Sequence, residues 1–350
     1  MAVQPVAKSR MLLQARNREE MLTFQSYAKI NWTLEILGRR PDGYHELRTI
    51  LQTVDLADTL HFTPLDREIS IHCSHPEVPT DERNLVWKAA SLLRQQTGID
   101  RGVQVEIIKR IPTAAGLGGG SSNAAVTLLA LLKLWEIELP LRQLFELGSR
   151  LGADVPFFFI GGTCLGVGRG DEVYPFADIK VDHLLLVNAG ILVPTRDVYA
   201  NLPPELTNPE AVVKMPLSLE LACEAVSLPL CHARPGAGSE VDNAEIIPRP
   251  FGSRTIRPGL LKNDLEIPVL PRYPRLAQVR QQLIDLGARE SLMSGSGSTV
   301  FAIFDNDQVR QEAAAALQAA GWWVAPVGTI CRDDYGSRMP ALTRVADPHR

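Results

Sequence analysis

A glycine-rich stretch, residues 111–127, constrains this chain more than any other segment. Its sequence is IPTAAGLGGGSSNAAVT, with four glycines within five positions, followed by two serines and an asparagine. The apolar residues of 103–108 before it predict a strand, and the leucine-rich residues 128–135 after it predict a largely buried helix. Glycines let backbone N–H groups approach a ligand, and a helix start carries unpaired N–H groups and a partial positive charge. This order of elements therefore predicts an anion-binding site.

The end of the loop marks the start of the helix. Ser121, Ser122 and Asn123 are all residue types that cap helices, so they signal the helix boundary. The loop is not a P-loop, because no Gly-Lys-Ser/Thr closes it, and it is not GxGxxG. A flexible glycine turn without a ligand is the alternative. Four glycines and two hydroxyls that open an apolar helix favour phosphate binding.

The composition limits the ways in which a phosphate could be bound. A chain of 350 residues predicts two domains, and a hydrophobic content of 45% is ample for a sizeable core. The net charge of −4 argues against a protein that binds nucleic acid or a membrane surface. A phosphate ligand must therefore be held by a local site, because the chain offers no broad basic surface.

The cysteines and the apolar runs indicate the compartment. The cysteines are odd in number and form no CxxC pair, which argues against a zinc site or a disulfide framework and favours a reducing cytosol. Apolar runs such as residues 184–187 are far too short to span a bilayer. We expect a cytoplasmic protein. Its cysteines are Cys73, Cys164, Cys223, Cys231 and Cys331.

The first half of the chain is rich in predicted strands. Residues 1–22 lack a signal-peptide core, and we expect a disordered tail or a start assigned too far upstream. Residues 24–37 alternate as a strand, and a turn at 41–43 leads to further strands at 47–54 and 59–62. A helix is predicted over 84–93, with Asp81 or Asn84 as its cap. One face of the first strand carries Ala28, Ile30, Trp32, Leu34 and Ile36, and the other carries Tyr27, Lys29, Asn31 and Thr33.

The residues after the glycine loop predict a boundary between two domains. We expect a helix at 141–151, a short apolar strand at 157–160, a glycine-rich hairpin at 161–170 and a strand at 183–188. The predicted domains are residues 23–190 and 191–335, with a tail at 336–350 and a proline-rich, partly flexible stretch at 201–258. The second domain is predicted to be a compact α+β unit. Its expected elements are helices at 263–270, 275–286 and 307–319 and strands at 290–293, 299–304 and 322–327.

Two charged residues acquire a chemical meaning beside a phosphate loop. Lys29 shares a strand face with Asn31 and Thr33, and Asp154 precedes a proline and three phenylalanines. A solvated lysine and a turn aspartate are the commoner roles for such residues. Phosphoryl transfer requires mainly positioning and charge neutralisation. Together, these residues would supply a base for an alcohol and a cation near the transferred group.

The motifs resemble those of the GHMP small-molecule kinases. The matching blocks are IPTAAGLGGGSSNAA, SYAKINWTLEI and MSGSGSTVFAIF. Two further blocks, PDGYHELRTILQTVDLADTL and LGADVPFFFIGGTCLGVGRG, are similar to the branch of the family that acts on 4-diphosphocytidyl-2-C-methyl-D-erythritol. The five blocks occur in the family's order and cover roughly residues 24–190 and 260–330. The N-terminal extension and the long stretch at 201–258 depart from the pattern.

The resemblance implies a fold and an activity. The expected class is α+β, with a ribosomal-S5-like N-terminal domain, a ferredoxin-like C-terminal domain and an active site in the cleft between them. The expected reaction transfers a phosphoryl group from ATP to the 2-hydroxyl of the cytidyl-linked small-molecule substrate, in the non-mevalonate route to isopentenyl diphosphate. Mg²⁺ would accompany ATP without a protein metal cage, and Ser121 or Ser122 could reach the ion. We expect a monomer or homodimer, with no nucleic-acid or membrane partner.

The resemblance also implies roles for individual residues. Asp154 falls where the family has its catalytic base, and Lys29 falls where the family has the lysine that pairs with that base. Asn31 is expected to contact the substrate, Tyr44 and His45 to hold the cytosine, and Tyr199 to cover its other face. Gly295 to Ser298, with Gly295 and Ser296 foremost, are expected near substrate and phosphates. The expected ATP-binding residues are Pro112, Thr113, Ala114, Ala115, Gly116, Leu117, Gly118, Gly119, Gly120, Ser121 and Ser122.

Three alternatives remain at this level. A kinase for another alcohol, such as mevalonate or homoserine, would keep the glycine loop but would not need Tyr44 and His45. A non-catalytic nucleotide sensor on the same fold could lose Lys29 or Asp154, and this chain has both. An RNA-binding module is disfavoured by the net charge of −4 and the lack of a clustered basic face.

Overall fold

The computed structural model describes residues 21–207 and 261–340. Residues 1–20 and 341–350 of the predicted tails lie outside these ranges, as do most of the proline-rich stretch, Cys223 and Cys231. Residues 336–338 of the predicted C-terminal tail instead end a helix that begins at residue 332. No helix of the described ranges is long and apolar enough to cross a membrane.

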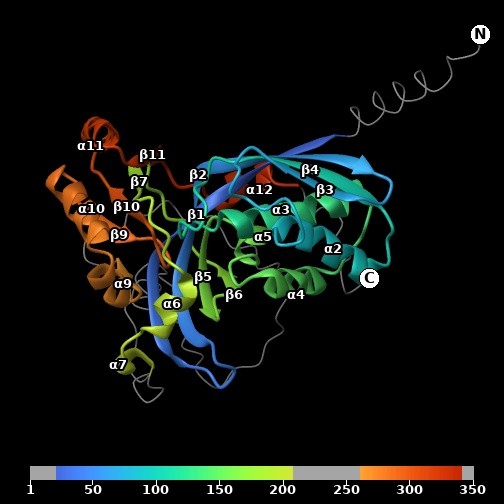
Figure 1. Cartoon of the computed structure of the whole chain (residues 1–350), viewed down its shortest axis with the longest axis horizontal. Coiled ribbons are helices and arrows are strands. Elements are labelled where there is room, and N and C mark those ends of the chain that lie inside the picture. Colours follow the sequence, from blue (N-terminus) through green and yellow to red (C-terminus); the bar gives the residue numbers. More distant parts are fainter. Residues whose placement is uncertain (1–20, 208–260, 341–350) are drawn as a thin grey trace, which may run out of the picture.

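The described chain is built from two β-sheets (Figure 1). The larger sheet has the order β3-β4-β2-β1-β8, with β5 paired to β2 and β6 paired to β5. The smaller sheet has the order β11-β7-β10-β9. The strands of the larger sheet are β1 (Leu22–Arg39), β2 (His45–Leu65), β3 (Ile69–Cys73), β4 (Gly102–Ile108), β5 (Thr163–Gly168), β6 (Glu172–Pro175) and β8 (Lys262–Asn263). Those of the smaller sheet are β7 (Leu184–Asn188), β9 (Glu290–Met293), β10 (Thr299–Ile303) and β11 (Trp323–Val327).

The helices form two groups, one with each sheet (Figure 1). The larger sheet packs against α2 (Leu85–Thr97), α3 (Gly119–Leu134), α4 (Leu141–Leu151) and α5 (Phe157–Ile160). The smaller sheet packs against α10 (Pro274–Asp285) and α11 (Asp307–Ala319). The shorter helices are α6 (Thr195–Ala200), α7 (Pro204–Thr207), α9 (Glu266–Arg272) and α12 (Arg332–Arg338). This arrangement confirms the predicted α+β class.

A long antiparallel pair of strands, β1 and β2, connects the two halves. The strands predicted separately at 47–54 and 59–62 are one strand, because a bulge at residues 55–56 accommodates the polar Asp55 and the pairing then resumes. Gly43, with φ of +87°, allows the tight turn that returns the chain from β1 to β2. The predicted turn at 41–43 is therefore confirmed, and it leaves Tyr44 and His45 at the start of β2.

The smaller sheet is buried on both faces. Leu184 and Leu186 of β7 point toward the larger sheet, whereas Leu185 and Val187 point toward α10 and α11. Trp32 of β1 packs edge-on against Phe301 of β10, with ring centroids 5.5 Å apart. The apolar face predicted for β1 is divided, because a bulge between Asn31 and Thr33 sends Leu34 and Ile36 to the core beside α10. The core between the sheets therefore fixes β1 relative to both halves.

Some predicted elements and limits differ in the structure. Residues 157–160 form the single-turn helix α5 and not a strand, because Pro156 leads into helical backbone and Gly161, with φ of +66°, ends it. Phe157, Phe158 and Phe159 are all buried, and a short run that is apolar on all sides does not distinguish a strand from a helix. β7 lies before the boundary predicted at residue 190 yet belongs to the smaller sheet, so the division of the chain there stays a prediction.

Candidate active site

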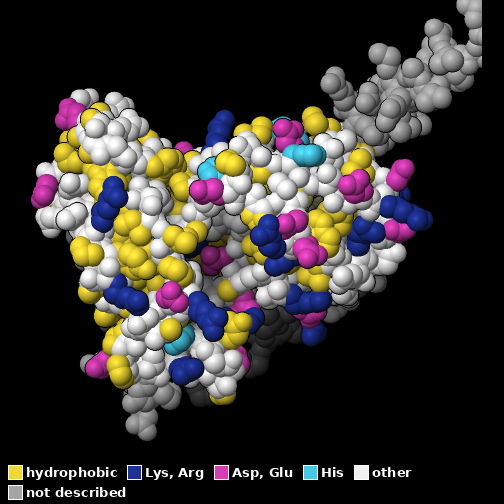
Figure 2. All heavy atoms as spheres, in the orientation of Figure 1, with side chains coloured by type: hydrophobic (Ala, Val, Ile, Leu, Met, Phe, Trp, Pro, Cys, Tyr) yellow, Lys and Arg dark blue, Asp and Glu magenta, His cyan; other side chains and the backbone are white. Residues whose placement is uncertain are grey.

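A large cavity lies where the two halves meet. Its volume is about 1330 Å³, which exceeds that of a pocket for one drug-sized ligand and allows room for two substrates. The space-filling view shows a hollow between the two parts of the molecule (Figure 2). It is lined by every residue predicted for the site except Ser122 and Ser298: Lys29, Asn31, Tyr44, His45, residues 112–121, Asp154, Tyr199, Gly295, Ser296 and Gly297.

The glycine loop has a backbone that only glycine accommodates at two positions. Gly116 and Gly118 have φ of +74° and +68°, a region that other residues rarely adopt. A Cβ added at Gly116 would lie 2.1 Å from the carbonyl oxygen of Ser294, and one at Gly118 would lie 3.0 Å from Cγ of Lys29. Ala114 adopts φ of +50° without being glycine, which marks local strain. The loop is therefore folded tightly against Lys29 and the segment around Ser294.

The start of α3 differs from the boundary that the sequence signals. The helix begins at Gly119, and Gly118 precedes it without any side chain that could cap it. The first N–H groups of α3 consequently lack side-chain partners from the cap position, while Gly118 to Ser121 line the cavity. An uncapped helix start at a cavity is suited to binding an anion.

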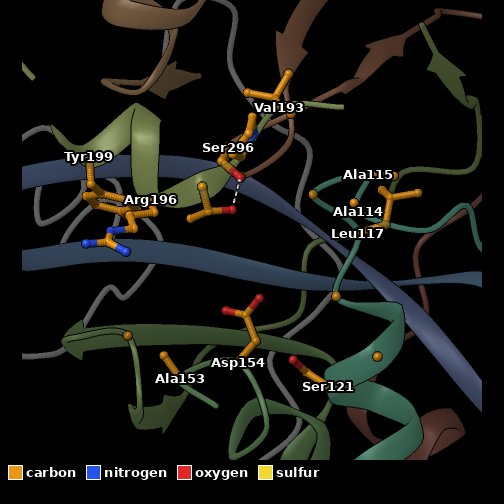
Figure 3. Close-up of a pocket in the computed structure, with 18 of the residues that line it drawn as sticks. Ala114, Ala115, Leu117, Ser121, Ala153, Asp154, Val193, Arg196, Tyr199 and Ser296 are labelled. Atoms are coloured by element: carbon orange, nitrogen blue, oxygen red, sulfur yellow. Dashed lines mark hydrogen bonds between the residues drawn. The ribbon is translucent and has the colours of Figure 1, made fainter. Parts of the chain in front are cut away.

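The two serines of this first turn point in different directions. The Ser122 hydroxyl is fully buried and lies 2.7 Å from the hydroxyl of Ser26, which also lies 2.7 Å from Oδ1 of Asn123. This burial does not fit the role expected for Ser122 at a bound metal. Ser121 faces another way, because successive side chains on a helix point about 100° apart. Ser121 lines the cavity, and its hydroxyl lies on the same side as Asp154 (Figure 3).

Lys29 is buried beneath the glycine loop. Its Nζ donates hydrogen bonds to Oδ1 of Asn31 at 2.7 Å and to the carbonyl of Gly116 at 2.9 Å. The main-chain N–H of Lys29 donates to the carbonyl of Leu117, so strand and loop are joined directly. Burial lowers the pKa of Lys29, and the nearby charge of Asp154 opposes this effect. The lysine is thus a desolvated cation held in place by three parts of the chain.

Asp154 faces Lys29 across the cavity. Its Oδ2 lies 3.8 Å from Nζ of Lys29, and 40% of its side chain is exposed. The residue sits in the turn between α4 and α5, and its carboxylate points into the cavity (Figure 3). An exposed carboxylate beside a buried cation can accept a proton from a bound ligand. This is the geometry that a general base requires.

Asn31 is oriented by a short chain of hydrogen bonds. Its Nδ2 donates to the hydroxyl of Thr49 at 2.7 Å, and that hydroxyl donates to the carbonyl of Thr33 at 2.6 Å. The amide oxygen of Asn31 is left facing Lys29. The predicted place of Asn31 beside Lys29 in the cavity is therefore what the structure has, and its substrate contact stays a prediction.

Aromatic rings gather at the opposite end of the cavity. The rings of His45 and Tyr199 lie 5.2 Å apart, whereas Tyr44 is 57% exposed and is covered by the guanidinium of Arg169 at 5.0 Å. Burial, with the charge of Arg39, lowers the pKa of His45. His45 is therefore neutral near pH 7, and its ring can donate one hydrogen bond and accept another.

The loop of residues 294–298 connects the two ends of the cavity. The Ser294 hydroxyl donates to the carbonyl of Gly116 at 3.0 Å. The hydroxyls of Ser296 and Thr195 lie 2.8 Å apart, which joins the loop to α6 (Figure 3). Gly295 and Ser296 line the cavity as predicted. Thr195, in contrast, had no signal in the sequence.

Other lining residues were also missed by the sequence analysis. Val78, Pro79 and Leu85 form a wall beside the glycine loop, and Lys109 lies next to them. Lys109 is paired with the fully buried Asp58 at 2.7 Å. Asp58 also accepts hydrogen bonds from the main chain of residues 110 and 111 and so fixes the entry to the loop. A buried aspartate in a strand is the one feature that could have indicated this support.

Comparisons with known proteins identify the family of the chain. Residues 84–162 match the model of the GHMP kinases N terminal domain, and residues 256–321 match that of the GHMP kinases C terminal region. The chain is 37% identical to the 4-diphosphocytidyl-2-C-methyl-D-erythritol kinase of Geobacter sulfurreducens over 310 residues, which is 88% of this chain and 99% of that protein.

Solved structures show the same fold. A crystal structure of a 4-(cytidine 5'-diphospho)-2C-methyl-D-erythritol kinase aligns with a TM-score of 0.65 and 35% identity, over 88% of this chain and 99% of the other. The homoserine kinase of Cytophaga hutchinsonii aligns with a TM-score of 0.62 but only 15% identity, over 92% of this chain and 96% of the other. The second likeness is one of fold alone.

The close approach of the glycine loop to Ser294 gives a test of the site's construction. We expect Gly116→Ala to lower the free energy of unfolding by at least about 2 kcal/mol, because a left-handed backbone conformation is costly for alanine and its Cβ would overlap a carbonyl oxygen. Urea denaturation measures the change.

Gly120→Ala is the matched control, because a Cβ at Gly120 would have its nearest neighbour at 3.6 Å. We expect its unfolding midpoint to stay the same or to rise, since alanine is favoured over glycine in a helix. Equal losses of stability in the two variants would contradict the described loop conformation.

Proposed function

The chain belongs to the GHMP kinase family and, within it, to the 4-diphosphocytidyl-2-C-methyl-D-erythritol kinases, and on this premise we propose how its cavity performs the reaction. The enzyme phosphorylates the 2-hydroxyl of 4-diphosphocytidyl-2-C-methyl-D-erythritol with ATP, giving the 2-phosphate and ADP in the non-mevalonate route to isopentenyl diphosphate. The observation that carries the proposed roles is the ion pair of Lys29 and Asp154, which lies between the glycine loop and the aromatic end of the cavity.

Asp154 acts as the general base. The 2-hydroxyl of the acceptor approaches its exposed carboxylate, which takes the proton as the oxygen attacks the γ-phosphorus of ATP. The new O–P bond forms while the bond from the γ-phosphorus to the β-phosphate oxygen breaks, and ADP leaves with that electron pair. The proton then passes from Asp154 to solvent, which reaches the carboxylate because 40% of its side chain is exposed.

Lys29 supplies the positive charge at the reacting centre. Its ammonium lies 3.8 Å from the carboxylate of Asp154, and it stabilises the negative charge that spreads over the transferred group. Its hydrogen bonds to Asn31 and Gly116 hold the ammonium in place, so little reorganisation is needed when charge develops. The buried position makes this interaction stronger than it would be in water.

The glycine loop and the start of α3 bind the phosphates of ATP. Their uncapped N–H groups and the helix dipole favour the negative charge of the β- and γ-phosphates. Mg²⁺ bound to ATP would neutralise charge on the same phosphates, and Ser121 is the hydroxyl of this turn that faces the cavity. The wall of Val78, Pro79 and Leu85 provides an apolar surface for the adenine.

The aromatic end recognises the cytidyl group of the acceptor. Tyr44 and Tyr199 offer flat surfaces on which a cytosine ring can stack, and neutral His45 can bond to its edge. Tyr199 contacts His45 directly, so a cytosine would enter by separating or sliding over these rings. The small-molecule acceptor follows from the family, whereas a monomeric or homodimeric state and a cytoplasmic location stay predictions.

The alternative functions are less well supported. Mevalonate and homoserine carry no base that would use two tyrosine rings and a neutral histidine at the far end of a cavity of about 1330 Å³. A non-catalytic sensor would not need a carboxylate 3.8 Å from a buried lysine. Phosphoryl transfer to the cytidyl-linked acceptor accounts for both the aromatic end and the ion pair.

An acceptor panel tests the substrate. The purified protein is given ATP, Mg²⁺ and, in separate reactions, 4-diphosphocytidyl-2-C-methyl-D-erythritol, mevalonate and homoserine, and ADP release is measured. We expect turnover with the cytidyl acceptor to exceed that with the other two by at least about 100-fold in kcat/KM, since stacking and hydrogen bonds to the base are lost with the smaller alcohols. Comparable rates with all three would overturn the substrate assignment.

Removal of the carboxylate tests the base. We expect Asp154→Asn to lower kcat by about 1000-fold or more, because an amide cannot take the proton, while calorimetry should give an affinity for ATP within about threefold of the wild type. Asp182→Asn is the control, since Asp182 is 61% exposed and is not among the lining residues. A kcat within tenfold of the wild type would remove Asp154 from this role.

A further inference from the structure

A short polar segment next to the site, residues 262–266 with the sequence KNDLE, has no part in the predicted chemistry. Its residues 263–266 were expected to open a helix, but α9 begins only at Glu266. Lys262 and Asn263 instead form β8, which pairs in parallel with Thr33 and Leu34 of β1. The segment therefore lies alongside the strand that carries Lys29.

Three side chains of this segment bond to main-chain groups of other elements. Asp264 accepts a hydrogen bond from the N–H of Ile36 in β1 at 2.9 Å, and Glu266 accepts one from the N–H of Met293 in β9 at 2.8 Å. Asn263 donates from Nδ2 to the carbonyls of Met293 at 2.8 Å and Gly295 at 2.7 Å. The segment thus connects β1 with the loop of residues 294–298.

The amide of Asn263 is fully used in this arrangement. Its Oδ1 accepts from the N–H of Leu265 at 3.0 Å, so two carbonyls face the NH₂ group and one N–H faces the oxygen. The side chain is buried, with 4% of the residue exposed. No other residue type of this size provides two donors and one acceptor in this geometry, and a buried donor without a partner is costly.

The loop that Asn263 holds lies against the catalytic lysine. A Cβ added at Gly295 would lie 3.2 Å from Nζ of Lys29 and 3.3 Å from the carbonyl oxygen of Gly116. The Ser294 hydroxyl and Nζ of Lys29 both donate to that same carbonyl of Gly116. The main-chain N–H of Thr299 further donates to the carbonyl of Ala115. A shift of the loop would therefore move the groups that hold the ammonium.

We propose that Asn263 is a positioning residue for phosphoryl transfer, which acts through Gly295 and Gly116 to hold the ammonium of Lys29 against Asp154. This inference rests on the proposed roles of Lys29 and Asp154. Asn263 itself is not among the residues that line the cavity, so it has no direct contact with substrate. Its effect is geometric, and displacements of about 1 Å at a reacting centre can cost about 100-fold in rate.

The test is a double-mutant cycle between positions 263 and 29. Asn263→Asp keeps the size of the side chain but replaces the two donors by a carboxylate that repels the carbonyls of Met293 and Gly295. We expect it to lower kcat by about 30- to 100-fold while KM for the cytidyl acceptor stays within about threefold, because the side chain of Asn263 bonds to Met293, Gly295 and Leu265 and to none of the aromatic residues proposed to hold the cytosine. Radiolabelled ATP keeps the slow variants measurable.

The second arm introduces Asn263→Asp into the Lys29→Met enzyme. If Asn263 acts through Lys29, the added change should lower kcat by less than about threefold, since the group that it positions is already gone. If the fold-losses of kcat in the two single variants multiply in the double variant, Asn263 acts independently of Lys29, and the inference is overturned. A kcat for Asn263→Asp within threefold of the wild type would overturn it as well.

Controls separate this outcome from misfolding and from failure of the proposed function. Asp264→Asn makes the opposite exchange at the adjacent buried position, keeps an acceptor for Ile36, and should leave kcat within about threefold. Calorimetry with ADP shows whether each variant is folded, and it must give one binding site per chain.

If Asn263→Asp does not bind ADP in this way, the double-mutant cycle is repeated with Asn263→Ser, which keeps one donor. An unchanged kcat in Lys29→Met alone would instead refute the role of Lys29 and, with it, this inference.

Discussion

Burial of the Lys29 ammonium is the constraint on which the rest of the site depends. A desolvated cation is costly unless hydrogen bonds and an opposite charge offset its lost hydration. Here the partners come from three separate parts of the chain, namely Asn31 of β1, the carbonyl of Gly116 in the glycine loop and the carboxylate of Asp154. Desolvation remains the larger effect on the pKa of Lys29. The folded chain thus holds a poorly solvated charge in the cavity, at the position where we propose that the phosphoryl group is transferred.

The two halves of the molecule meet around this charge. The larger sheet supplies Lys29. The loop of residues 294–298 follows β9 of the smaller sheet, and its Ser294 donates a hydrogen bond to the same carbonyl of Gly116 that accepts one from Lys29. The contact between Trp32 of β1 and Phe301 of β10 holds the two sheets together in the core between them. The proposed donor and acceptor ends of the cavity are therefore aligned by one interface, and in our proposal the residues at the aromatic end select the alcohol. Kinases for different alcohols can share this fold for that reason.

The sequence predicted the chemistry better than the local geometry. The glycine loop, the strand before it and the helix after it could be predicted, because each depends on a local pattern. The α+β class could be predicted as well, and Asn84 is one of the two residues predicted as the cap of α2. The start of α3, the inward turn of Ser122 and the helix at 157–160 could not, since they are decided by contacts with Ser26 and by burial on all sides. Asn263 was missed for a related reason. Its partners lie about thirty residues away, and nothing in its own neighbourhood indicates them.

The most direct test of the account is the titration of Lys29 itself. NMR of selectively labelled lysine, with the signal assigned by its loss in a Lys29 variant, measures the pKa of the Nζ group in the free enzyme. We predict a pKa below the ordinary lysine value, and a further fall in Asp154→Asn, because that change removes the charge that favours the ammonium form. An ordinary pKa in the wild type, or one that Asp154→Asn leaves unchanged, would contradict a buried cation coupled to the carboxylate of Asp154.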